Sequence, residues 1–292
     1  MKYIKGFLNR YKIKNTNRSF VGDILLFAFL LLFGTLSIWP LLYALNNAFK
    51  PLDEIFMYPP KLFVQRPTLD NFRDLFYLLN SSRVPMSRYI FNTLFITFMG
   101  TLGSIFIASL AAFPLAKYDF KGKKVLNKLI VYALMFNSTV LAIPNYLVIS
   151  WFHLTDTIWS IILPVMSGTL GLYLIKNFMV QIPTVLIESA KIDGANEFYI
   201  YRKIMLPLAK PAVITLIILQ FNTLWSATGG IYIYTQEKKP LSYAIGQIVN
   251  AGIARTGASS AVTLIMLIVP IAVFIISQSN VLDTFQTSGI KD

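Results

Sequence analysis

The chain has 292 residues, of which 55% are hydrophobic and only 13% are charged. Soluble domains carry about 25% charged residues, so this composition indicates a membrane protein. Cysteine is absent and His153 is the single histidine, which excludes disulfides, thiolate metal centres and sites built from several histidines. The net charge of +13 is typical of basic cytoplasmic loops in membrane proteins, and we expect no nucleic-acid partner.

Residues 1–23 form a basic segment that we expect to lie in the cytoplasm. An apolar run follows over residues 24–45, close to the ~20 residues that a helix needs to cross the hydrocarbon core. This run is too long for the core of a signal peptide, so it predicts a retained first transmembrane helix. The basic residues before it are Lys2, Lys5, Arg10, Lys12, Lys14 and Arg18.

Residues 46–88 are a long, proline-containing segment that we place outside the membrane, with a short helix over Leu69–Leu79. The core, residues 89–279, is expected to hold five more transmembrane helices, and residues 280–292 a cytoplasmic tail. The expected fold is all-α, with six transmembrane helices and both termini inside, because Lys and Arg are more numerous in the segments placed inside. The five core helices are expected at Tyr89–Ala116, Leu126–Phe152, Ile158–Phe178, Ala212–Thr228 and Ser259–Ser277.

The cytoplasmic loop 179–210 contains a long polar stretch, ESAKIDGANEFYIYRKIMLP, over residues 188–207. We expect a helix–turn–helix over residues 183–207. Pro183 suits the first position of a helix, since its missing N–H costs nothing there. Gly194 suits a helix stop, because glycine accepts a left-handed backbone. A second short helix is expected from Asn196 to about Met205, and small residues at the corner would let another protein approach closely.

This stretch resembles the EAA motif of bacterial ABC importer permeases: E-A-A, three residues, G, nine residues, I-x-L-P. Ser189 replaces the first alanine of the motif, and the other fixed positions match. The Asp-Gly-Ala at 193–195, the length and the tail resemble the smaller permease of maltose-type sugar importers. The resemblance implies the type I ABC importer permease fold. It also implies that these residues couple the chain to an ATPase: Glu188, Ser189, Ala190, Asp193, Gly194, Ala195, Ile204, Leu206 and Pro207.

The same resemblance implies a set of partners in a bacterial cell membrane. They are a second homologous permease, two ABC ATPase subunits and an extracytoplasmic solute-binding lipoprotein that delivers a sugar. The chain has no G-x-x-x-x-G-K-[ST] sequence, so we expect it not to be an enzyme and to hold no cofactor, with ATP and Mg²⁺ on the ATPases. The predicted membrane segments also lack a central Asp, Glu, Lys or Arg, which argues against an ion-coupled transporter.

Neutral polar and aromatic side chains inside the predicted membrane helices are candidates for a sugar path. Hydrogen bonds between helices, worth about 0.6 kcal/mol each, explain the same residues, and we favour that explanation. The candidates are Asn137, Thr139, Asn145, Gln220, Asn222 and Trp225. Three alternatives to a sugar permease stay open: an ABC permease for another solute, a membrane channel or structural subunit, and an integral membrane enzyme. The enzyme would need clustered acidic or histidine side chains at one membrane face, and the sequence offers none.

Overall fold

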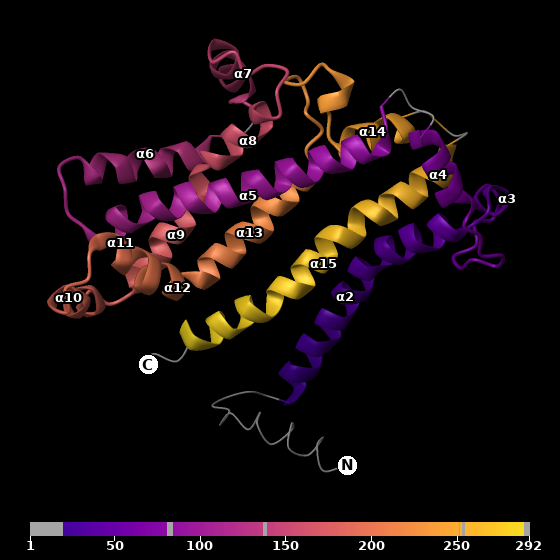
Figure 1. Ribbon diagram of the computed structural model, residues 1–292. Coiled ribbons are helices and arrows are strands. Elements are labelled where there is room, and N and C mark those ends of the chain that lie inside the picture. Colours follow the sequence, from indigo (N-terminus) through magenta and orange to yellow (C-terminus); the bar gives the residue numbers. More distant parts are fainter. Residues whose placement is uncertain (1–19, 81–83, 137–138, 251, 253–254, 289–292) are drawn as a thin grey trace.

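The computed structural model describes residues 20–80, 84–136, 139–250, 252 and 255–288, and these residues form helices and their connections without a strand (Figure 1). Helix α5 (Met86–Lys117) is central and packs against α8 (Trp159–Met166), α9 (Thr169–Gln181) and α13 (Lys210–Trp225). Helix α15 (Thr256–Ser288) packs against α13 and against α2 (Phe20–Phe49). The all-helical class expected from the sequence is therefore the class observed.

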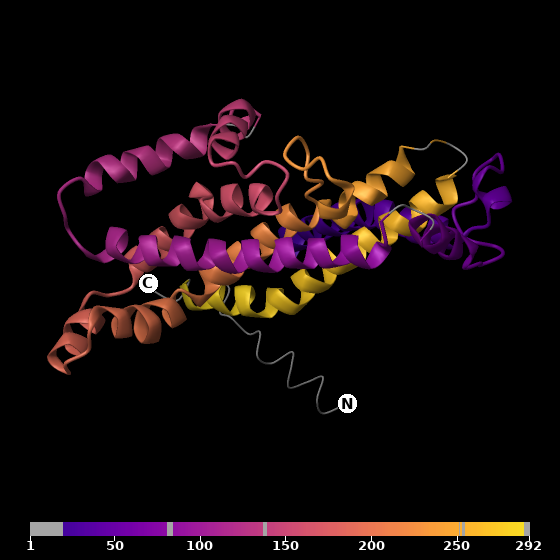
Figure 2. The ribbon, with the colours of Figure 1, turned by 45° about the horizontal axis from the view of Figure 1, so that its top comes forward.

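Shorter elements occupy the two ends of this bundle. Helices α3, α4 and α14 lie at one end, and α10, α11 and α12 lie at the other (Figures 1 and 2). The helix expected at residues 69–79 is α4. The bounds are α3 (Leu52–Ile55), α4 (Asp70–Asn80), α10 (Val185–Ile192), α11 (Glu197–Ile200), the π-helical η1 (Tyr201–Met205), α12 (Leu206–Leu208), the 3₁₀-helical η2 (Gln236–Lys238) and α14 (Leu241–Val249).

Four helical segments in the described part of the chain are long and apolar enough to cross a membrane: Gly22–Phe49, Met86–Lys117, Trp159–Gln181 and Thr256–Ser277. A fifth crossing exists if Glu197–Leu208 and Lys210–Trp225, which are bent by 74° to one another, count as one broken span. The expected count of six is therefore not confirmed. The second, fourth and sixth predicted helices match observed segments closely, and the first lies within α2.

The third predicted span, residues 126–152, is wrong as a single helix. The structure has two shorter helices there, α6 (Lys123–Met135) and α7 (Ala142–Trp151). At 1.5 Å per residue they extend ~20 Å and ~15 Å, less than the ~30 Å hydrocarbon core. The two helices are separated between Met135 and Ala142, and the sequence of this stretch contains the polar run Asn-Ser-Thr at 137–139. Such side chains favour caps and turns because they compete for backbone hydrogen bonds.

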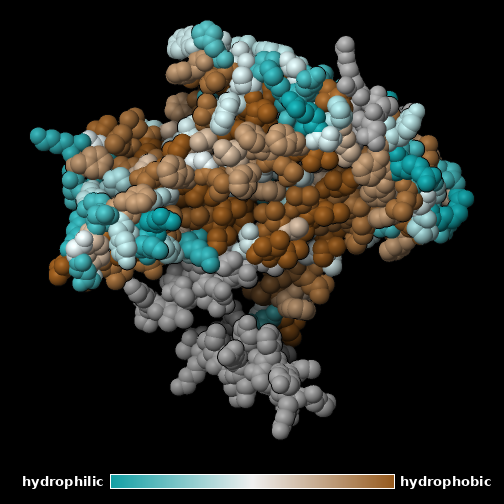
Figure 3. All heavy atoms as spheres, in the orientation of Figure 1, coloured by the Kyte–Doolittle hydropathy of each residue, from teal (hydrophilic) through white to brown (hydrophobic). Residues whose placement is uncertain are grey.

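Apolar side chains gather in a broad band across the middle of the molecule, and hydrophilic ones at both ends (Figure 3). Helix α2 contributes strongly to the exposed apolar surface, with Leu25 66% and Phe27 67% exposed. A buried cluster beneath the α10 end joins α5, α9, η1 and α13 through Ile175, Met179 and Met205, which are fully buried. A lipid-facing surface and a packed core near the α10 end are thus both present.

Candidate functional site

The corner between α10 and α11 is a helix stop built around Gly194. The Ala195 N–H donates to the Ala190 carbonyl at 2.9 Å, and the Gly194 N–H donates to the Lys191 carbonyl at 3.0 Å. These two bonds form a Schellman motif, which needs a left-handed residue after the helix. Gly194 supplies it with φ of +79°. The turn predicted from Asp193-Gly194 therefore lies where the sequence placed it.

The second helix of this corner begins at a polar cap and extends further than expected. The Asn196 Oδ1 accepts a hydrogen bond from the Tyr199 N–H at 2.8 Å, which satisfies a free donor of the first turn. The chain then passes through η1 and α12, so helical backbone continues through Pro207 to Leu208 rather than ending near Met205. Pro207 therefore lies within a continuous helical stretch, directly after the π-helical turn η1.

The residues predicted to couple the chain to an ATPase fall into two groups. Glu188, Ser189, Asp193, Gly194 and Pro207 are exposed. The other four, Ala190, Ala195, Ile204 and Leu206, are buried or half-buried against the core cluster. The structure thus places Ala190, Ala195, Ile204 and Leu206 inward, and the polar positions together with Gly194 and Pro207 outward. Their contact with an ATPase stays a prediction.

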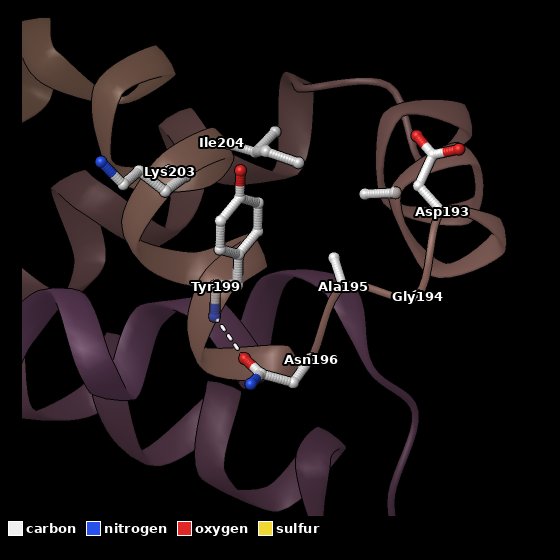
Figure 4. A pocket seen from close by; sticks show the side chains of 8 residues that line it. Asp193, Gly194, Ala195, Asn196, Tyr199, Lys203 and Ile204 are labelled. Carbon is white, nitrogen blue, oxygen red and sulfur yellow. Dashed lines mark hydrogen bonds between the residues drawn. The ribbon is translucent and has the colours of Figure 1, made fainter.

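A surface hollow of about 530 Å³ lies between α10 and the second helix of the corner. Asp193 lies on one side of it, and Tyr199, Lys203 and Ile204 lie on the other (Figure 4). Asp193 contributes a carboxylate to its lining, and Lys203 on the other side points its ammonium group away from Asp193. The full lining is Ala190, Asp193, Gly194, Ala195, Asn196, Tyr199, Lys203 and Ile204.

Exposed apolar side chains surround this corner, and the sequence analysis missed them. Ile192 is 87% exposed, Val185 is 66% exposed and Phe198 is 60% exposed. Their exposure near the corner makes it a candidate interaction surface. Ile192 is the last residue of α10 and directly precedes Asp193-Gly194, and nothing in the local sequence indicates that its side chain is exposed.

Charged groups tie the corner to the end of α5. Lys191 Nζ lies 2.8 Å from Glu197 Oε1, and the Tyr118 hydroxyl donates to Glu197 Oε2. Tyr118 follows the last residue of α5, and Lys191 Nζ lies 5.0 Å from the centre of its ring. The hydrogen bond from Lys191 lowers the pKa of Glu197 and raises that of Lys191, while burial raises the pKa of Tyr118.

A second, buried contact joins the same elements. The hydroxyls of Ser109 on α5 and Tyr201 in η1 are 2.7 Å apart, and their residues are 0% and 6% exposed. The Phe113 ring lies 5.4 Å from the Tyr118 ring and 6.0 Å from the Tyr201 ring, measured between centroids. The last turns of α5 are therefore fixed to the corner by two hydrogen bonds and an aromatic cluster.

The structure does not gather the candidates for the sugar path into one lining. Gln220 and Trp225 are buried in α13, and the Trp225 ring stacks on Phe221 at 5.7 Å. Asn222 is exposed and donates to the Ile218 carbonyl of its own helix at 3.1 Å.

The remaining candidates lie around α7. Thr139 and Asn145 are exposed, before and on that helix, and Asn137 lies outside the described residues. A stacked pair 6.3 Å apart, Tyr146 and Tyr232, connects α7 to the loop after α13 instead of to the core. A role for any of the six in solute contact stays a prediction.

Two buried hydroxyls escaped the sequence analysis. Thr97 and Thr101 are 3% and 7% exposed, and neither Oγ1 atom has a hydrogen-bond partner in the described part of the chain. Both line an apolar hollow of about 300 Å³ between α5 and α13. Their spacing of four residues puts them on one face of α5, and that spacing was the available signal.

Comparison with known proteins agrees with this architecture. The family model described as "Binding-protein-dependent transport system inner membrane component" matches residues 100–284. The polygalacturonan/rhamnogalacturonan transport system permease protein YtcP of Bacillus subtilis is 34% identical over 238 residues, which cover 80% of this chain and 79% of that protein. The arabinooligosaccharides transport system permease protein AraQ of Bacillus subtilis is 28% identical over 226 residues, covering 77% and 80%.

A solved structure shares the fold. It is a chain of a bacterial ABC transporter involved in the import of the acidic polysaccharide alginate, with a TM-score of 0.74 and 21% sequence identity, covering 91% of this chain and 99% of that one. Because the family model matches more than half of the sequence, the chain belongs to the binding-protein-dependent transport system inner membrane components and is a multi-pass membrane protein of such a transport system.

Proposed function

We propose that the chain is the transmembrane permease subunit of an ATP-driven, binding-protein-dependent importer for a sugar or oligosaccharide in a bacterial cell membrane. Its family supports the transport role. The relatives named for polygalacturonan, arabinooligosaccharide and galactooligosaccharide transport support an oligosaccharide as the solute. In this proposal a second permease completes the path, and an extracytoplasmic binding protein delivers the solute.

The corner at Gly194 carries the coupling part of the proposal. Ile192 and the partly polar hollow beside it offer a docking surface, and the bonds to Tyr118 and Ser109 connect that surface to α5. ATP and Mg²⁺ bind to two separate ATPase subunits, and movement of those subunits reaches α5 through the corner. The permease itself performs no chemistry in this scheme.

The proposed orientation places both termini in the cytoplasm. The start of α2 and the end of α15 both lie toward the side of the molecule that carries α10 (Figure 1). An ATPase that docks at α10 would then meet the cytoplasmic face, and α3, α4 and α14 would face the binding protein.

The docking surface can be tested with Ile192→Asp. Burying an isoleucine side chain contributes about 2 kcal/mol, so its loss should weaken binding of the ATPase subunits ~30-fold. Phe120→Asp is the matched control, because Phe120 is 42% exposed in the loop after α5, outside the hollow. Binding is measured by titrating purified ATPase onto permease in nanodiscs. Equal affinity of the Ile192→Asp and native complexes would refute docking at this corner.

The solute class needs a separate measurement. The assembled complex in proteoliposomes, supplied with its binding protein, should take up labelled plant-type oligosaccharides in an ATP-dependent manner. Uptake of amino acids instead, with no uptake of oligosaccharides, would favour the alternative of an ABC permease for another solute. ATP-independent solute flux through the purified chain would favour a channel.

A further inference from the structure

The connection over residues 51–66, here called the outer loop, buries charged groups and exposes apolar side chains. A loop surrounded by water has the opposite arrangement. Lys50, which directly precedes the loop, is 3% exposed, and Glu54 within it is 2% exposed. Tyr58 is 93% exposed and Phe63 is 72% exposed. The exposed large apolar residues of the outer loop are Leu52, Phe56, Met57, Tyr58, Leu62 and Phe63.

The buried charges have hydrogen-bond partners that hold the outer loop in this arrangement. Glu54 Oε1 accepts from the Gln65 N–H at 2.9 Å, and Glu54 Oε2 accepts from the Arg66 N–H at 3.3 Å. Lys50 Nζ donates to the Lys61 carbonyl. Burying a charge is costly unless it is hydrogen-bonded, so these bonds make the inward charges tolerable. The apolar residues are thereby left facing the surroundings.

The depth of the outer loop follows from its contact with α2. Leu62 and Phe63 share a small hollow with Trp39 and Tyr43 of that helix. About 20 residues cross the hydrocarbon core, so a core that begins near Ile24 ends near Tyr43. Tryptophan and tyrosine are also the residues enriched at the membrane–water boundary. Leu62 and Phe63 therefore lie at the level of the outer boundary.

We propose that the outer loop is a lipid anchor that lies in the outer headgroup layer of the membrane, with Tyr58 and Phe63 inserted. Its apolar surface continues the exposed apolar surface of α2, which faces the same medium. Its exposed charges Asp53 and Arg66 pair with each other, so the loop offers little net charge to a charged protein partner. Lipid is the occupant that fits a surface at this depth.

The anchor has a structural consequence for α2. None of the apolar part of α2 is buried inside the protein, and its contacts with other described helices are chiefly with α15 and α4. A helix that packs chiefly against one long neighbour, and is otherwise surrounded by lipid, gains a fixed depth when its outer end is attached to a segment in the headgroup layer. This inference needs only the membrane location of the family and stands whether or not the solute is a sugar.

The absence of cysteine from the chain permits a direct test. Spin labels are placed one at a time at Tyr58→Cys and Phe63→Cys, in the complete transporter with cysteine-free partners in lipid nanodiscs. Leu31→Cys, in the middle of α2, is the lipid control, and Glu237→Cys, on an exposed outer turn, is the water control. Collision of each label with oxygen is compared with collision with a water-soluble nickel chelate.

For the labels at positions 58 and 63, the ratio of the oxygen collision rate to the nickel-chelate collision rate should lie between the ratios of the two controls. A ratio equal to that of Glu237→Cys would overturn the proposal, because the loop would then lie in water. Shielding from both reagents would also overturn it, since a protein would then cover the loop. Shielding that appears only after addition of the binding protein would overturn the proposal as well, because the exposed apolar side chains would then be a contact for that protein.

Discussion

The buried hydrogen bond between Ser109 and Tyr201 gives the sharpest test of how the corner communicates with α5. Tyr201→Phe removes one hydroxyl and keeps the ring that packs against Phe113. Ser109 is not left without a partner, because its Oγ also donates to the Phe106 carbonyl at 3.2 Å. The expected loss in the free energy of unfolding is therefore small, about 0.5–1.5 kcal/mol.

The reverse change should cost more. Ser109→Ala leaves the hydroxyl of Tyr201, a 6% exposed residue, without its partner. An unsatisfied buried group costs about 1–3 kcal/mol. The double variant removes both hydroxyls and should be close in stability to Tyr201→Phe alone. This order of stabilities is specific to the hydrogen bond between Ser109 and Tyr201. A general destabilising effect of mutation would not produce it.

The functional measurement is the number of solute molecules imported per ATP hydrolysed by the complex in proteoliposomes. Tyr201→Phe should lower that ratio, while the ATPase rate stays within about twofold of native, because hydrolysis resides on other subunits in the proposed scheme. Thr215→Val is the matched control. The Thr215 hydroxyl bonds to the Pro211 carbonyl of its own helix at 2.9 Å, so its loss breaks no tie between helices.

One result would refute this reasoning. If Tyr201→Phe loses stability as expected but imports solute with the native ratio, the bond holds the fold together and transmits nothing. If Thr215→Val lowers the ratio equally, the effect reflects a general loss of packing near α13. A ratio that falls with Ser109→Ala and recovers in the double variant would show strain from the orphaned hydroxyl of Tyr201.

Three further predictions concern the corner and the outer face. Gly194→Val should destabilise the corner by about 1–2 kcal/mol and lower import, because the φ of +79° at this position disfavours a β-branched side chain. Gly194→Asn should retain import, since asparagine accepts a left-handed backbone. Uptake assays compare the two variants. The pKa of Glu197 is lowered from its ordinary 4.5 by Lys191, so this pair stabilises the protein above that pH and is lost as pH falls through the lowered value. Thermal unfolding of native protein should therefore lose this contribution only in acid, while Glu197→Gln should lack it throughout. Hydrogen bonds, chiefly those from Thr235, hold the pKa of Asp156 well below its usual range. Asp156 therefore stays ionised at mildly acidic pH, and backbone hydrogen exchange in residues 229–240 should stay slow there. The same exchange should become fast in Asp156→Asn.

Local sequence signals were enough to place the corner. Asp193-Gly194 marks a helix end through backbone preference alone, and Asn196 marks the next start through its capping side chain. The long apolar segments of α2, α5 and α15 were equally readable, because length and hydropathy decide a membrane-crossing helix. These features depend on neighbours in sequence and need no knowledge of tertiary packing.

The third span shows where such reading fails. Residues 126–152 are mostly apolar, and this composition predicts a single transmembrane helix. The polar run at 137–139 is a sequence signal for dividing the segment. The bond between Ser109 and Tyr201 was beyond sequence reasoning for another cause. The two residues are 92 positions apart, and their meeting depends on how η1 packs beneath α5.

Helix α5 joins the two functional ends of the molecule. At its inner end it meets the corner through Ser109, and near its outer end Asn92 Nδ2 donates to the Glu237 and Lys239 carbonyls at 2.8 and 2.9 Å. The Thr93 hydroxyl accepts from the Leu241 N–H at 2.7 Å. Hydrogen bonds along a helix resist bending, so in the proposed scheme a displacement of the corner would reach the turn at 237–241 through α5. The scheme requires such a connection, because it places the binding protein and the ATPases on opposite faces of the membrane.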